Sequence, residues 1–189
     1  MEGGSMEVNF NWIYMSQFNV WSNNHAYWHD KATTLMHASE ILWKSYESGE
    51  LLDGGNTHRF LMGLSFELIF KAFYVANGEK PPTKHSLNNL TKHCDLQLSK
   101  KDRKILEVLS GYILWEGRYP TPNEPKNKKK NLPYYQGIKE QNDPFMNTLP
   151  IEKQLDGESN QLLKRSDLDF EHLIDLWRKI NDAYVGKYI

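Results

Sequence analysis

The chain has 189 residues, enough for one domain with a substantial core but short for two ordinary domains. Its 23 basic and 24 acidic side chains nearly cancel, so no overall positive field marks a nucleic-acid binder. A single cysteine, Cys94, excludes an internal disulfide framework or a cysteine-based zinc site and favours a reducing compartment. No apolar run approaches about 18 residues, and the N-terminus lacks a signal-peptide layout. We therefore expect a cytoplasmic protein with no membrane partner.

Residues 1–20 form a predicted N-terminal extension, and residues 21–189 a single helical domain. The extension starts with MEGGS, whose flexible composition is typical of a cloning remnant, so we leave it out of the fold prediction. The first helix of the domain is predicted between Asn24 and Tyr46, where apolar residues recur at three- and four-residue spacing. These residues are Trp28, Ala32, Leu35, Met36, Leu42, Trp43 and Tyr46.

A second helix is predicted to begin at Asn56 or Thr57, since either side chain can act as its N-cap. Asn77 and Gly78 supply a left-handed stop, and two prolines follow shortly afterwards. We expect this helix to be the most buried of the bundle. Its apolar stripe consists of Leu61, Leu64, Leu68, Ala72 and Val75.

Two shorter helices are predicted next. Ser86 can cap a third helix, which we expect to continue through Leu87 and Leu90 to Leu96. Ser99, with Asp102 three residues later, resembles a capping box and opens a fourth helix. Gly117 and Pro120 are expected to end this fourth helix. Its buried residues are predicted to be Ile105, Leu106, Leu109, Tyr112 and Ile113.

The last helix is predicted to open at Ser166, with Asp169 three residues on. Its buried residues are predicted to be Phe170, Leu173, Ile174, Trp177, Ile180 and Tyr184. Because no segment alternates polar and apolar residues, we expect an all-α, up-and-down bundle of about five main helices. Residues 121–165 have no clear apolar period, and we predict a flap with a short helix near Pro133 to Gln141 and a turn before Ser166.

Three motifs then occur in a suggestive order. The second helix carries Glu-x-x-x-Lys at Glu67 and Lys71, the following loop ends in His-x-Leu at His85, and Arg-Tyr-Pro begins at Arg118. Over roughly Tyr27 to Pro120 this pattern resembles the HEPN superfamily. The resemblance implies a helical bundle, frequently dimeric, from a superfamily rich in RNA-cleaving toxins and defence proteins that also has non-catalytic members.

Glu67 and Lys71 stand four residues apart on a helix that is otherwise apolar nearly all round, so we expect at least one to be partly buried. A buried carboxylate needs a partner. Arg118 is the preferred candidate, because a guanidinium binds a carboxylate through two hydrogen bonds. These residues either clamp three helices together or present Arg118 to a phosphate.

Metal-free RNA cleavage needs a base, an acid and a cation near the phosphorane, which histidine and arginine can supply. The nuclease members of the superfamily carry a histidine shortly after the motif arginine. Here the residues after Arg118 are YPTPNE, and Asn123 is an amide that cannot act as a base. The candidate catalytic residues are therefore Arg118, Glu67, Lys71 and, if the fold brings it close to Arg118, His85. Alternatively, His85 is a hydrogen-bonded residue that holds its loop.

The remaining histidines suggest little chemistry. His25 and His29 have the spacing of two zinc ligands on a helix, but no third ligand is convincing, so we expect no metal and no cofactor. His58 and His93 are predicted to be ordinary cap or surface residues.

A single basic cluster lies in the predicted flap and is followed by two tyrosines. Such a patch can follow phosphates while tyrosines stack on bases, although a solvated loop has the same composition. The candidate ligand-binding residues are Arg118, Tyr119, Lys126, Lys128, Lys129, Lys130, Tyr134 and Tyr135.

The sequence therefore favours a HEPN-like protein that acts as a binding or regulatory module for RNA or a nucleotide. The resemblance alone implies a prokaryotic defence or toxin–antitoxin setting, a homodimer and a protein partner encoded nearby. Two alternatives stay open: an active metal-independent ribonuclease with a rearranged site, and a purely structural dimeric adaptor.

Overall fold

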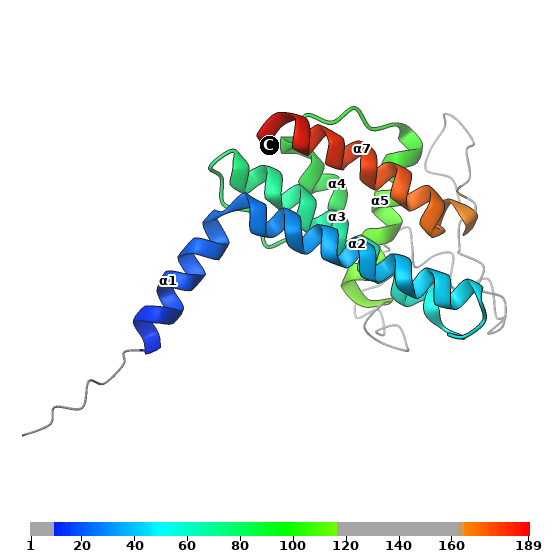
Figure 1. Ribbon diagram of the computed structural model, residues 1–189. Helices are drawn as coiled ribbons and strands as arrows, with labels where there is room; N and C mark the ends of the chain where they lie inside the picture. The colour runs from blue at the N-terminus through cyan, green and yellow to red at the C-terminus, as the bar shows by residue number, and fades with distance from the viewer. Residues whose placement is uncertain (1–9, 117–162, 164) are drawn as a thin grey trace, which may run out of the picture.

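The structure, a computed structural model, describes residues 10–116, 163 and 165–189 (Figure 1). The described part is an all-α bundle with six α-helices and no strand, as the sequence predicts. The α-helices are α1 (Phe10–Asn23), α2 (His25–Glu47), α3 (Gly54–Ala76), α4 (Leu87–Leu90), α5 (Lys100–Gly111) and α7 (Phe170–Tyr188). Two short 3-10 helices, η1 (Thr91–His93) and η3 (Arg165–Leu168), and one short π-helix, η2 (Tyr112–Glu116), accompany them.

Helix α3 is the centre of the bundle. It packs against α2, α4, α5 and α7, and 15 of its 23 residues are buried, more than in any other described helix. The prediction that this helix is the most buried is therefore confirmed. Because α3 has neighbours on nearly every side, its few polar side chains must find partners inside the protein.

Asn24 begins α2, as predicted. Its side-chain oxygen accepts a hydrogen bond from the Ala26 backbone N–H at 3.0 Å, which satisfies one of the free donors of the first turn. The segment before it, predicted only as an extension, contains α1. This helix leaves the bundle at an angle and projects away from it (Figure 1).

The predicted start of α3 is wrong. Its N-cap is Asp53 rather than Asn56 or Thr57, and the helix already begins at Gly54. The reason is tertiary: a Cβ atom at Gly54 would lie 2.6 Å from the Cβ atom of Tyr46, so only glycine fits where the chain turns back against α2. The predicted end is confirmed, because Asn77 caps the helix and Gly78 follows with a φ of +75°.

The third predicted helix is shorter than expected. Ser86 is the residue before α4, but the α-helix ends at Leu90 and η1 ends at His93, so it does not reach Leu96. Asp95 has a φ of 50°, which turns the chain out of a helical path.

The capping box that opens α5 is confirmed. The Ser99 hydroxyl accepts from the Asp102 backbone N–H at 3.0 Å, and the Asp102 carboxylate accepts from the Ser99 N–H at 2.9 Å. The wide turn η2 follows this helix, and the predicted stop at Gly117 and Pro120 lies outside the described residues.

Helix α7 begins four residues later than predicted. Ser166 belongs to η3, and Asp169 is the residue before the helix, which starts at Phe170. The predicted apolar residues of α7 are all buried. The flap and its predicted helix at Pro133 to Gln141 lie outside the described residues, apart from Leu163 and Arg165. Among the helices that are described, none has both the length and the apolar character needed to cross a membrane.

Gly63 brings α3 close to the end of α5, and this contact can be tested. A Cβ atom there would lie 2.9 Å from Ile113 Cγ1 and 3.2 Å from the Leu109 carbonyl oxygen. We expect Gly63→Ala to lower stability by about 1–3 kcal/mol, the usual cost of overpacking, despite the better helix propensity of alanine. Gly186→Ala in α7 is the matched control, because no atom lies within 4 Å of its Cβ position. Urea unfolding should show a lower free energy of unfolding for Gly63→Ala and a slightly higher one for Gly186→Ala. Equal changes in the two variants would contradict the close packing at Gly63.

Candidate functional site

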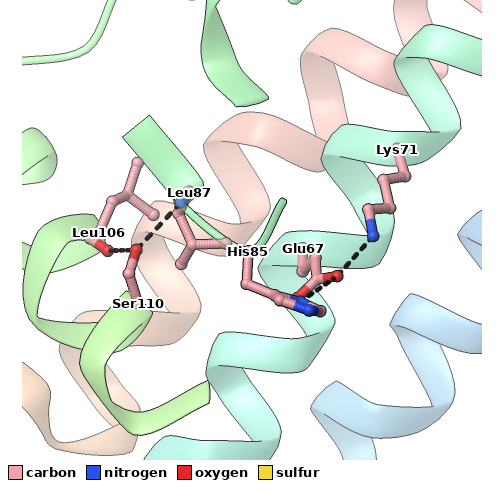
Figure 2. Close-up of polar contacts among 6 residues, drawn as sticks. All are labelled: Glu67, Lys71, His85, Leu87, Leu106 and Ser110. Carbon is pink, nitrogen blue, oxygen red and sulfur yellow. Dashed lines mark hydrogen bonds and ion pairs between the residues drawn. The ribbon is translucent and has the colours of Figure 1, made fainter. Parts of the chain in front are cut away.

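Three of the four candidate catalytic residues meet in the structure (Figure 2). Lys71 Nζ lies 2.6 Å from Glu67 Oε1, one helical turn apart on α3. His85, from the loop before α4, places its Nδ1 3.0 Å from Glu67 Oε1 and 2.9 Å from Oε2. Glu67 therefore binds a cation on one side and an imidazole on the other. We call these residues the Glu67 cluster.

The cluster lies at the boundary between core and surface. Only 5% of the Glu67 side chain and 11% of the Lys71 side chain is exposed, whereas His85 is 39% exposed. A buried carboxylate is unfavourable unless it is paired and hydrogen-bonded. Lys71, one turn further along α3, provides an ammonium for Glu67, and His85 on the loop before α4 provides an imidazole. His85 is thus the member of the cluster that a molecule from solution can reach.

The contact with Glu67 also determines which nitrogen of His85 is available. An ionised carboxylate only accepts hydrogen bonds, so Nδ1 must carry a proton. Nε2 then remains as an acceptor in the neutral ring or a donor in the charged ring. No described residue forms a hydrogen bond with this nitrogen. A carboxylate that orients a histidine in this way leaves the second nitrogen ready for a ligand or a proton.

The loop that carries His85 is held against α5. The Leu87 backbone N–H donates to Ser110 Oγ at 3.0 Å, and the Ser110 hydroxyl donates to the Leu106 carbonyl at 2.8 Å (Figure 2). Leu87 itself is fully buried. A second bond joins the Asn88 side-chain amide to the Arg103 carbonyl at 2.8 Å. Because both elements that meet at the cluster are anchored, His85 has a defined position relative to α3.

Among the described residues, the partners of Glu67 are Lys71 and His85. The contact with Arg118 that was preferred on sequence grounds stays a prediction. Arg118 lies outside the described residues, and so do the other candidate ligand-binding residues, namely Tyr119, Lys126, Lys128, Lys129, Lys130, Tyr134 and Tyr135. The alternative role proposed for His85, a hydrogen-bonded residue of its loop, describes what the structure shows.

His25 and His29 do not face each other across a metal site. His25 Nδ1 lies 2.6 Å from the Tyr184 hydroxyl, and His29 Nε2 lies 2.7 Å from Asn181 Oδ1. The His29 ring also stacks on Tyr184, with ring centroids 4.6 Å apart. Both histidines thus fasten α2 to α7. Within the described ranges, no three His, Cys, Asp or Glu side chains gather in a way that could hold a metal ion.

His58 is the histidine that the sequence interpretation placed wrongly. Expected at a cap or on the surface, it is fully buried where α2, α3 and η3 meet. Its Nε2 lies 3.1 Å from the Leu168 carbonyl and therefore donates, while the Ser39 hydroxyl lies 2.7 Å from Nδ1. Burial lowers the pKa of His58 to about 4, with a smaller contribution from the charge of Arg59. This neutral histidine holds η3 onto the bundle and is closed to ligands.

No protein-family model, curated protein sequence or solved structure matches this chain. The resemblance of its motifs to HEPN proteins therefore stays a prediction.

Proposed function

We propose that the chain is a HEPN-like protein that binds RNA or a nucleotide. The Glu67 cluster carries this proposal, because it presents the Nε2 atom of His85 from an anchored loop. As a charged ring, His85 can donate from this atom to a phosphate oxygen, and as a neutral ring it can accept from a ribose hydroxyl.

The charge around this loop supports an anionic ligand. Residues 80–104 contain seven Lys and Arg side chains but only two Asp and Glu, although the whole chain has a net charge of −1. Exposed members of this basic segment are Lys80, Lys84, Lys92, Lys100, Lys101 and Arg103. Lys101 forms an ion pair with Asp167 at 2.7 Å. Local positive charge of this kind favours phosphate contacts and makes binding sensitive to salt. The basic residues of the predicted flap would add to it.

The biological setting is the part of the proposal that depends on the resemblance alone. It comprises a prokaryotic defence or toxin–antitoxin system, a homodimer and a protein partner encoded nearby, whereas the expected cytoplasmic location rests on the composition of the chain. The Glu67 cluster is compatible with each of these but argues for none of them.

A second candidate function is metal-independent RNA cleavage, and the Glu67–His85 contact favours it. A carboxylate that accepts from Nδ1 of a histidine orients the ring, which is the arrangement of an oriented general base. In this reading His85 would remove the 2′-hydroxyl proton, and Arg118 would supply the cation for the phosphorane. Lys71 would neutralise Glu67 rather than touch the substrate, because its Nζ is already bonded to that carboxylate.

Binding of labelled single-stranded RNA tests both candidates. We expect the protein to retain RNA without cleaving it, and His85→Asn to weaken the affinity roughly three- to tenfold, the loss of about one ordinary hydrogen bond. Asparagine places an amide nitrogen close to the position of Nδ1, so it keeps the donor to Glu67 and removes only Nε2. The free energy of unfolding should change little.

His93→Asn is the matched control. Its Nδ1 also approaches a carboxylate, Glu79 Oε2 at 3.4 Å, but both side chains are about half exposed and the pair lies on η1. It should bind RNA as the unaltered protein does. Cleavage that persists in EDTA and disappears in His85→Asn would instead support the ribonuclease. If the unaltered protein retains no RNA even at low salt, the structural adaptor becomes the better account.

A further inference from the structure

Helix α1 is exposed in an unusual way for a helix rich in large apolar residues. It projects from the bundle as an arm, which we define as Phe10–Asn23 (Figure 1). From Met15 to the end of the arm, more than half of the surface of each large apolar residue is exposed, these residues being Met15, Phe18, Val20 and Trp21. Met15, Phe18 and Trp21 recur every three residues and so share one side of the helix, and exposed apolar patches commonly mark interaction sites.

The direction of the arm is determined by contacts at its base. Asn24 caps α2 and separates the two helices. The Trp28 indole N–H, on α2, donates to the Ser22 carbonyl at the end of the arm at 3.2 Å, and Trp28 also packs against the core. These contacts join the end of the arm to the start of α2 and so favour the angle at which the arm leaves the bundle.

The composition of the arm limits what can cover it. Its 14 residues include no Asp, Glu, Lys or Arg. Phosphates and anionic lipid surfaces are recognised through basic side chains, which the arm lacks. An isolated helix of this length is also marginal in water, so its stability must come from burying its apolar residues. An uncharged apolar protein surface meets both conditions.

We infer that the arm is a dimerisation surface and that its occupant is the same arm of a second copy of this chain. Two uncharged helices meet without like-charge repulsion, and a two-fold axis lets the same residues contact each other from both sides. The four exposed arm residues and Tyr27 are each about half exposed. Since large side chains bury about 150–250 Å² each when fully enclosed, the five offer roughly 500 Å² per copy. Two copies would bury roughly 1,000 Å², the least that a specific interface needs.

The mass of the intact chain in solution tests this surface. Light scattering at increasing concentration should approach twice 22.2 kDa. The double variant Phe18→Glu and Trp21→Glu should weaken self-association at least tenfold, because it places like charges against each other. The variant Ile41→Glu is the control, since Ile41 is 69% exposed but lies on α2, away from the arm. It should dimerise as the unaltered chain does, and circular dichroism should show the same bundle in all of them.

A charge-swap experiment then tests whether arm meets arm. A second variant, Phe18→Lys and Trp21→Lys, should be monomeric alone and should form a mixed dimer with the glutamate variant. An unaltered chain that stays monomeric at 100 µM, roughly where a weak specific dimer would form, overturns the inference. A dimer that survives both double variants overturns it as well. The same holds if the unaltered chain is monomeric but sediments with neutral phosphatidylcholine vesicles, since a lipid surface would then cover the arm.

Discussion

Replacing Glu67 with alanine should lower the free energy of unfolding by about 3–5 kcal/mol, because the Lys71 ammonium is then left unpaired inside the protein. In the intact chain Lys71 Nζ bonds Glu67 Oε1 at 2.6 Å, with 11% and 5% of the two side chains exposed. His85 also loses the acceptor for its Nδ1 proton, although it is exposed enough for water to replace it. Urea unfolding of the two proteins measures the difference directly.

The chain contains a matched control for this pair. Glu40 and Lys44 on α2 have the same four-residue spacing and a 2.7 Å contact, but their side chains are 32% and 70% exposed. Glu40→Ala should therefore cost less than about 1 kcal/mol, as exposed ion pairs do. Replacing Glu67 and Lys71 together by leucine should recover most of the stability lost in Glu67→Ala, since no buried charge remains. Equal losses of unfolding free energy in Glu67→Ala and Glu40→Ala would show that burial does not determine how much the Glu67–Lys71 pair contributes to stability.

Acidification should destabilise the protein through His58. Burial lowers the pKa of this histidine from 6.5 to about 4, so between these pH values the unfolded chain binds a proton that the folded chain does not. Its contribution to stability is complete above about pH 6.5 and is lost as the pH falls towards 4. At 1.36 kcal/mol per pKa unit the loss is about 3 kcal/mol.

The slope of stability against pH tests this prediction. Carboxylates also contribute to that slope, so the informative quantity is the difference between variants. Between pH 4 and 6.5, His58→Gln should have a slope smaller by up to about 1.4 kcal/mol per pH unit, equivalent to one proton. His172→Gln, on the exposed face of α7, should keep the slope of the unaltered chain. A slope unchanged in His58→Gln would mean that His58 is not held neutral by the fold.

The pair at the centre of the candidate site was predictable because it is local. Glu67 and Lys71 are one turn apart on a helix whose other residues are mostly apolar, so the sequence alone indicates that at least one of them is partly buried. His85 is 18 residues further along, and its contact with Glu67 depends on how the loop between α3 and α4 returns to α3. The sequence could nominate His85 as a candidate but could not predict that its ring lies against Glu67.

The sequence by itself determined the helical class, the course of α2, the stop at Asn77 and Gly78, the capping box of α5 and the apolar stripe of α7. All of these depend on residues within one or two turns of each other, where side-chain period and cap chemistry decide the structure. Only the tertiary structure decided that α3 begins at Gly54, that His58 is buried and that His25 and His29 bind α7. Those outcomes depend on contacts between different elements, such as Gly54 of α3 against the Tyr46 Cβ atom of α2 and His58 with Leu168, which the pattern of a single helix does not encode.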